Sequence, residues 1–214
     1  MFDPTESEEY YEVETESPEV LREMLSENMV QPKAILSTVG GYPWPVFFSE
    51  EFPNAKILGF DNNPRQIAEF TETIKDTTGN TPYLLDITHT NRLENVLIKN
   101  NIDLTFLSNI PDYLEPDESE EIAEILIENE VSWILLSHMT NGDRSKGYQY
   151  QGCRSLLEVL KDEGYKIKRI TDNSYRYDIS EYYLAISPKK AKLTLIEQLR
   201  REQVKHLVTS FSPA

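Results

Sequence analysis

The sequence has little cysteine, no long apolar run and no leader-like start. Its one cysteine, Cys153, excludes an intrachain disulfide and any metal site built from several cysteines. No apolar stretch approaches the roughly 18 residues that a membrane-spanning helix requires. The first residues contain neither the basic segment nor the apolar core of a secretory signal. We therefore expect a cytoplasmic protein with no membrane partner.

Basic residues are also scarce. The 214-residue chain has 21 Lys and Arg against 37 Asp and Glu, and its formal net charge is -16. Such a surface repels a phosphate backbone, so nucleic acid is a disfavoured partner. The same charge is typical of a solvated surface that keeps a protein in solution. The length suits one domain of ordinary size with extensions.

The chain divides into an arm, a domain and a tail. Residues 1–16 are acidic, rich in Ser and Thr and almost free of aliphatic residues, so we predict a flexible arm, which Tyr10 and Tyr11 would alternatively lay over an active site. Residues 17–188 form an α/β domain whose N-terminal helix starts at Ser17 and Pro18. Residues 189–214 form a basic C-terminal helix and tail.

Within the domain, five apolar runs each precede a segment of helical periodicity. Because the runs are unbroken and not alternating, they predict parallel strands covered on both faces. Two further runs, YKIKRITD and YRYDISEYYLAIS, follow each other with only a turn, so the last strand is expected to be antiparallel. We predict a doubly wound, mostly parallel, seven-stranded Rossmann-like sheet. The five runs are KAILSTV, AKILGFD, TPYLLDIT, IDLTFLSNI and VSWILLSH.

The loop after the first strand lacks the glycine pattern of a dinucleotide site. In a doubly wound sheet, backbone N–H groups of this loop face the ligand, and G-x-G-x-x-G lets a pyrophosphate approach them. Here Gly40 and Gly41 are followed by YPWP, and proline has no N–H to donate. An NAD-dependent oxidoreductase is therefore disfavoured, whereas a cofactor without phosphates would lose little. Tyr42 and Trp44 either face the cofactor or plug the sheet end, and we favour the plug.

The second strand ends at Asp61 in the motif GFDNNP. A carboxylate at this place can accept both ribose hydroxyls of an adenosine. The alternative is that Asp61 only caps a turn before Asn63 and Pro64, which begin the next helix.

Four motifs resemble the first four strand motifs of class I S-adenosylmethionine-dependent methyltransferases. The resemblance covers about residues 33–188 and implies the fold of that family, S-adenosyl-L-methionine as cofactor, and methyl transfer to a small molecule or protein. The motifs are AILSTVGG, KILGFDNNPRQI, YLLDIT and IDLTFLSNIPDYL.

By position, the resemblance implies a set of cofactor-binding residues. Ser37 stands where the family often has an acid and Val39 where it often has glycine, so another group recognises the amino acid or binding is weaker. The implied residues are Ser37, Thr38, Gly40 and Gly41 for the methionine part, Asp61 and Asn62 for the ribose, Asp86 and Ile87 for the adenine, and Ser108 and Asn109 for the transferred group.

Two other functions remain open. GGYPWP faintly resembles the Gly- and Pro-rich loop of nicotianamine synthases, and FLSNIPDYL resembles the corresponding strand of betaine-lipid synthases. This resemblance implies transfer of the aminocarboxypropyl arm of the same cofactor instead of its methyl group. The other alternative is a non-catalytic interaction module of the same fold.

Methyl transfer mainly requires alignment in a dry pocket, with a base where the nucleophile carries a proton. Candidate catalytic residues are Asp112, Tyr113 and His138, which follow the fourth and fifth strands. His138 is the favoured base because imidazole titrates near neutral pH. The alternatives are that His138 is a hydrogen-bonded structural histidine and that Asp112 caps the helix that begins near Asp117. The three histidines are too scattered to predict a metal site. The polar loop MTNGDRSKGYQYQG is a candidate lid or substrate loop, with contacts from Asp143, Arg144, Tyr148 and Tyr150.

Overall fold

The computed structural model describes residues 18–40, 44–73, 80–141, 151–172, 178–193 and 196. The predicted acidic arm, Gly41, Tyr42 and most of the candidate lid loop lie outside the described residues. So does the predicted C-terminal helix beyond residue 193, except residue 196. Within the described part of the chain, no helix is long and apolar enough to cross a membrane.

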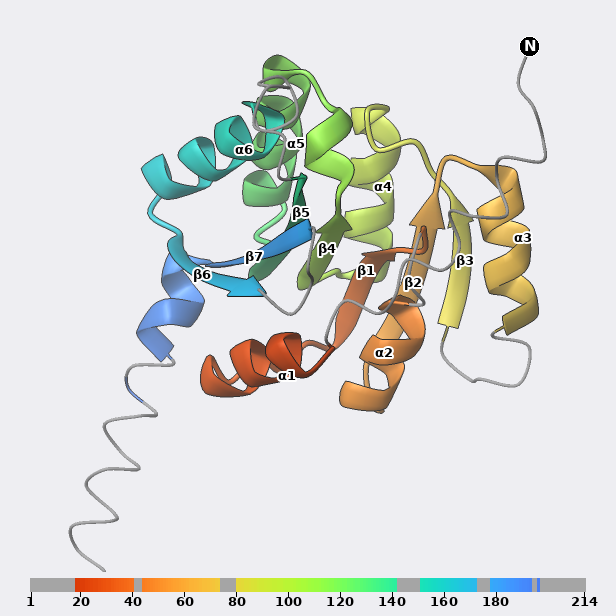
Figure 1. Ribbon diagram of the computed structural model, residues 1–214, viewed down its shortest axis with the longest axis horizontal. Helices are drawn as coiled ribbons and strands as arrows, with labels where there is room; N and C mark the ends of the chain where they lie inside the picture. The colour runs from red at the N-terminus through yellow and green to blue at the C-terminus, as the bar shows by residue number, and fades with distance from the viewer. Residues whose placement is uncertain are drawn as a thin grey trace, which may run out of the picture.

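The centre of the fold is one seven-stranded sheet with the strand order β3-β2-β1-β4-β5-β7-β6 (Figure 1). Strands β1 to β5 run parallel, while β7 pairs antiparallel with both β5 and β6. The predicted sheet is confirmed, including the reversed last strand. The strands are β1 (Ala34–Thr38), β2 (Lys56–Asp61), β3 (Asn80–Leu84), β4 (Leu104–Ser108), β5 (Trp133–Asn141), β6 (Lys166–Asp172) and β7 (Asp178–Ile186).

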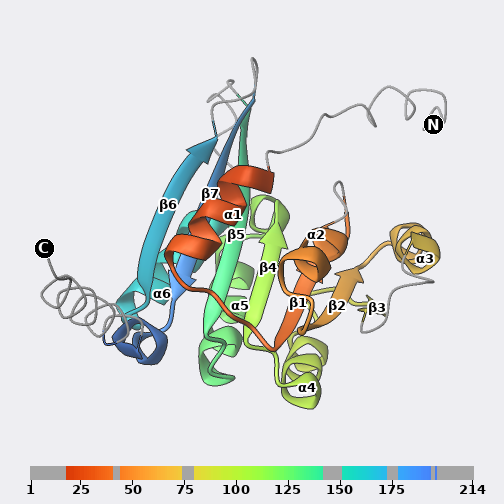
Figure 2. The same cartoon turned by 90° about the horizontal axis from the view of Figure 1, so that it is seen from below.

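Helices cover both faces of this sheet. Helices α4, α5 and α6 pack on one face, and α1 and α2 pack on the other, as the two views show (Figures 1 and 2). Helix α3 lies beside β2 and β3 at the edge. The helices are α1 (Pro18–Glu27), α2 (Trp44–Glu51), α3 (Pro64–Thr73), α4 (Thr90–Asn100), the 3₁₀ helix η2 (Ile110–Tyr113), α5 (Pro116–Glu128) and α6 (Gln151–Asp162).

The two-sided covering explains why the strands are apolar without alternation. In β1, Ile35 belongs to the core under α1 and α2, whereas Leu36 belongs to the core under α4, α5 and α6. Successive side chains of a strand point to opposite faces, so both faces need apolar residues. Trp44 is buried in the first of these cores, with its ring centroid 4.9 Å from that of Phe106. Trp44 therefore fills the α2 side of the sheet, as the plug interpretation predicted.

Two helix boundaries follow single residues of the sequence. Helix α3 begins at Pro64, and the Asn63 side-chain oxygen accepts a hydrogen bond from the Arg65 N–H at 2.9 Å. Helix α6 ends before Gly164, whose φ of +82° is the left-handed conformation that glycine adopts without strain. The N–H of Tyr165 then donates to the Leu160 carbonyl at 2.9 Å. Both boundaries confirm the sequence predictions.

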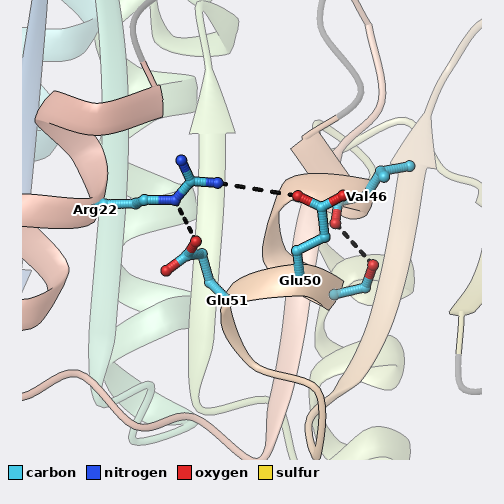
Figure 3. Close-up of polar contacts among 5 residues, drawn as sticks. Arg22, Val46, Glu50 and Glu51 are labelled. Atoms are coloured by element: carbon cyan, nitrogen blue, oxygen red, sulfur yellow. Dashed lines mark hydrogen bonds and ion pairs between the residues drawn. The ribbon is translucent and has the colours of Figure 1, made fainter.

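The N-terminal helix is attached to α2 as well as to the sheet. Arg22 of α1 forms an ion pair with Glu51 of α2, and its Nη2 lies 3.9 Å from Glu50 Oε2 (Figure 3). The Arg22 Cζ atom also lies 5.4 Å from the Phe47 ring centroid. The Arg22 side chain is 42% exposed, and exposed ion pairs contribute about 1 kcal/mol or less. Burial of apolar residues such as Leu21 is therefore the main attachment of α1.

Candidate functional site

A cleft of about 640 Å³ opens beyond the carboxyl ends of β1, β2 and β4. Strand β1 lies between β2 and β4 in the sheet. From β1 the chain proceeds outward to β2 and β3, and after β3 it crosses back to β4 on the other side of β1. Doubly wound sheets bind ligands at such a switch point, where the connecting segments diverge. The volume is within the roughly 300–1,000 Å³ of small-molecule sites.

Most predicted site residues meet in this cleft. Ser37 does not line it, because strand alternation points it to the same face as Ile35, where it is buried and donates to the Thr38 carbonyl at 3.1 Å. Gly41 lies outside the described residues. The predicted residues that line the cleft are Thr38, Gly40, Asp61, Asn62, Asp86, Ile87, Ser108, Asn109 and Tyr113.

Asp61 and Gly40 face each other across the ends of adjacent strands. The Asp61 Oδ1 accepts the Asn63 N–H at 2.8 Å, so Asp61 does cap the turn, as the alternative interpretation proposed. The same carboxylate also lines the cleft. A Cβ at position 40 would lie 3.1 Å from Asp61 Oδ2, closer than most such contacts. The glycine therefore leaves this oxygen open to a ligand.

The two cleft aspartates differ in their electrostatic surroundings. Burial raises the pKa of Asp61 above its ordinary value, against the opposing effect of the Asn63 and Asn62 N–H groups. The pKa of Asp86 is lowered, chiefly by the Thr88 hydroxyl, which donates to Asp86 Oδ1 at 2.8 Å. His89, whose Nδ1 lies 3.5 Å from Asp86 Oδ2, lowers the pKa of Asp86 further. Asp86 is thus the better stabilised anion.

Apolar side chains form the walls around these polar groups. Leu85 and Ile87 flank Asp86 and are both buried, and Phe60 precedes Asp61 at the end of β2. Ile87 was predicted from the sequence, whereas Phe60 and Leu85 were not. Their signal was position alone, because each is the apolar residue before an aspartate that ends a strand or follows its end.

The β4 end carries hydroxyls and an amide. The Thr38 hydroxyl accepts the Ser108 N–H at 3.2 Å, and the Ser137 hydroxyl lies 2.9 Å from that of Ser108. Asn109 has a φ of 55°, a left-handed conformation that asparagine tolerates better than most residues. Its side-chain oxygen is buried without a hydrogen-bond partner in the described structure.

The other two catalytic candidates lie behind the cleft. His138 Nδ1 contacts Asp112 Oδ1, and the two side chains are only 4% and 8% exposed. The alternative in which Asp112 caps the following helix is wrong, because Glu115 is the N-cap of α5 and forms a capping box with Glu118. The sequence analysis also did not predict η2, which carries Asp112. Four further residues that line the cleft were missed: Thr88, Ile110, Leu114 and Glu118.

No protein-family model and no curated protein matches the chain. Solved structures do. The N-methyltransferase NodS from Bradyrhizobium japonicum WM9, in complex with S-adenosylhomocysteine, is 13% identical with a TM-score of 0.60 over 87% of this chain and 89% of its own. Magnesium protoporphyrin IX methyltransferase (ChlM) from Synechocystis PCC 6803, with bound S-adenosylmethionine, is 13% identical with a TM-score of 0.56 over 79% and 77%.

A third similar structure is precorrin-6y C5,15-methyltransferase from Geobacter metallireducens GS-15, which is 16% identical with a TM-score of 0.51 over 78% of this chain and 87% of its own. At these identities the likeness concerns the fold. The strand order, with β7 antiparallel between β5 and β6, agrees with it. The chain therefore has the fold of the class I S-adenosylmethionine-dependent methyltransferases.

Proposed function

We propose that this protein is an S-adenosylmethionine-dependent methyltransferase acting on a small molecule or a protein. The observation that carries the proposal is the cleft at the switch point, where Asp61 faces Gly40. The similar structures of NodS and ChlM, which hold S-adenosylhomocysteine and S-adenosylmethionine, support the choice of cofactor. A cytoplasmic location is part of the proposal and rests on the sequence features alone.

The residues of the cleft fit this cofactor. The open oxygen of Asp61 suits ribose hydroxyls, and the apolar walls of Leu85 and Ile87 suit an adenine ring. Carboxylates but no Lys or Arg are found among the described residues that line the cleft, which favours a cationic ligand over a diphosphate.

The protein itself has to align the cofactor with the methyl acceptor and to exclude water from the cleft. When bound, S-adenosylmethionine supplies an electrophilic methyl group on a sulfonium. Asp61 would fix the nucleoside end, and Ser108 and Asn109 would define the end where the acceptor enters. Tyr113 lines the cleft with 81% of its surface exposed, so its ring is available to an acceptor.

Calorimetry tests the cofactor. We expect binding of S-adenosylmethionine and S-adenosylhomocysteine and none of NAD. Binding of NAD alone would overturn the assignment, and binding of none of the three would favour an interaction module. Product analysis during turnover then identifies the group transferred: S-adenosylhomocysteine indicates methyl transfer, whereas methylthioadenosine indicates transfer of the aminocarboxypropyl arm.

The pH dependence of binding provides a separate prediction. Only the ionised Asp61 carboxylate accepts two hydroxyls, so affinity for S-adenosylhomocysteine should fall as the pH drops through the raised pKa of Asp61. The pKa of Asp86 is shifted in the opposite direction, so Asp86 titrates on the acid side of Asp61. Calorimetric titrations from about pH 7 to about pH 4 cover the interval. The matched variant Asp61→Asn should lose this acid-side dependence, and an unchanged pH profile in that variant would contradict the prediction.

A further inference from the structure

The 3₁₀ helix η2 stands between the cleft and a buried polar pair. Its residues Ile110 and Tyr113 line the cleft, whereas Asp112 contacts His138 of β5. With 8% and 4% of their side chains exposed, Asp112 and His138 are nearly cut off from water. One short helix therefore carries the acceptor end of the cleft on one side and this pair on the other.

This helix needs support from outside itself. Four residues of 3₁₀ helix form too few hydrogen bonds to be stable alone. The backbone is tied at its start, because the Asn109 N–H donates to the Ser137 carbonyl at 3.0 Å. Within the helix, the Asp112 side chain contacts His138, the residue that follows Ser137 in β5. Strand β5 thus holds η2 at two consecutive positions.

The contact between Asp112 and His138 depends on which group carries the proton. An ionised carboxylate can only accept, so with Asp112 ionised the contact requires the His138 tautomer that carries a proton on Nδ1. Removing one partner of a buried polar pair takes a hydrogen bond from the other while that group stays desolvated, which is unfavourable. Asp112 would regain water by moving η2 away from β5. That movement would displace the cleft wall that η2 forms.

Two other titratable groups lie near this pair. Glu181 of β7 is opposite His138 in the register, but its oxygens accept from Arg169 and from the Tyr183 hydroxyl. Cys153 of α6 is buried, and its pKa is raised to about 12 by burial, with smaller effects of Asp112 and Glu181. The thiol is therefore neutral and adds no charge beside Asp112.

We propose that Asp112 and His138 are positioning residues, whose buried contact holds η2 and its cleft-lining residues in place for the ligand. The inference rests on the proposed function only for the identity of that ligand. It also predicts that a donor at the Nδ1 position suffices, since the contact with Asp112 uses that nitrogen.

The test compares two variants of the full-length protein. His138→Leu removes the donor, whereas His138→Asn keeps an amide N–H at the position of Nδ1. Hydrogen exchange of the 109–114 backbone and calorimetry with S-adenosylhomocysteine are measured for both. Tyr165→Phe is the matched control, because it removes a buried hydrogen bond to the Val131 carbonyl, before the other end of β5.

In His138→Leu, exchange in 109–114 should accelerate at least about 10-fold and S-adenosylhomocysteine affinity should fall about 10- to 100-fold. In His138→Asn, both should stay within about 3-fold of the parent protein, and Tyr165→Phe should leave exchange in 109–114 unchanged. Normal exchange in His138→Leu, or an equal defect in His138→Asn, would overturn the inference. If the parent protein does not bind the ligand, the proposed function fails, while the exchange data still decide the role of the pair.

Discussion

Replacing Asp61 with alanine is expected to weaken binding of S-adenosylhomocysteine by about 1–3 kcal/mol, or roughly 5- to 150-fold. The loss follows from removing two acceptor oxygens from the only carboxylate that faces Gly40 among the described residues. The backbone turn loses one hydrogen bond as well, from the Asn63 N–H. Isothermal calorimetry at neutral pH measures the effect.

Two variants separate ligand contact from local structure. Asp61→Asn keeps one acceptor oxygen and should show a smaller loss than Asp61→Ala. Glu69→Ala changes an exposed residue of the following helix, α3, and should bind like the parent protein. A folded Asp61→Ala protein with unchanged affinity would contradict the role assigned to this carboxylate.

Gly152→Val is expected to destabilise the protein by roughly 3 kcal/mol, at the upper end of overpacking effects. A Cβ at position 152 would lie 2.3 Å from the Pro111 carbonyl oxygen and 2.6 Å from that of Leu114. Both are backbone atoms, so no side-chain rotation relieves the contact. Helix α6 would have to move away from η2 and the segment that precedes α5. Urea unfolding monitored by circular dichroism gives the change in free energy.

Gln151→Val is the matched control, because it places the same side chain on the same helix at an exposed position. A surface change of this kind should alter stability by about 0.5 kcal/mol or less. Equal unfolding midpoints for Gly152→Val and Gln151→Val would show that α6 does not depend on this close approach.

The sheet could be predicted because its determinants are local. Unbroken apolar runs such as the one ending in Asp61 require burial on two faces, and this alone selects a parallel sheet with helices on both sides. The ends of those runs then meet at one edge of the sheet. Asp61 was predicted on this ground, whereas Asp86 and Asn109 followed from the resemblance to class I methyltransferase motifs, and all three line the cleft.

The rest of the site depends on contacts between distant segments. His138 and Asp112 are 26 residues apart, and their pairing follows from how η2 packs on β5. Nothing in the sequence marks η2 as a helix, since its residues obtain their support from elsewhere in the fold. Ser37 is a different case. Its position two residues after Ile35 places it on the face under α1 and α2, so strand alternation alone would have excluded it from the cleft.

The most direct test is a crystal structure of the protein with S-adenosylhomocysteine. The nucleoside should lie beyond the ends of β1 and β2, with both ribose hydroxyls donating to Asp61 and the adenine against Leu85 and Ile87. A compound bound at another place, or a sugar that makes no contact with Asp61, would contradict the account.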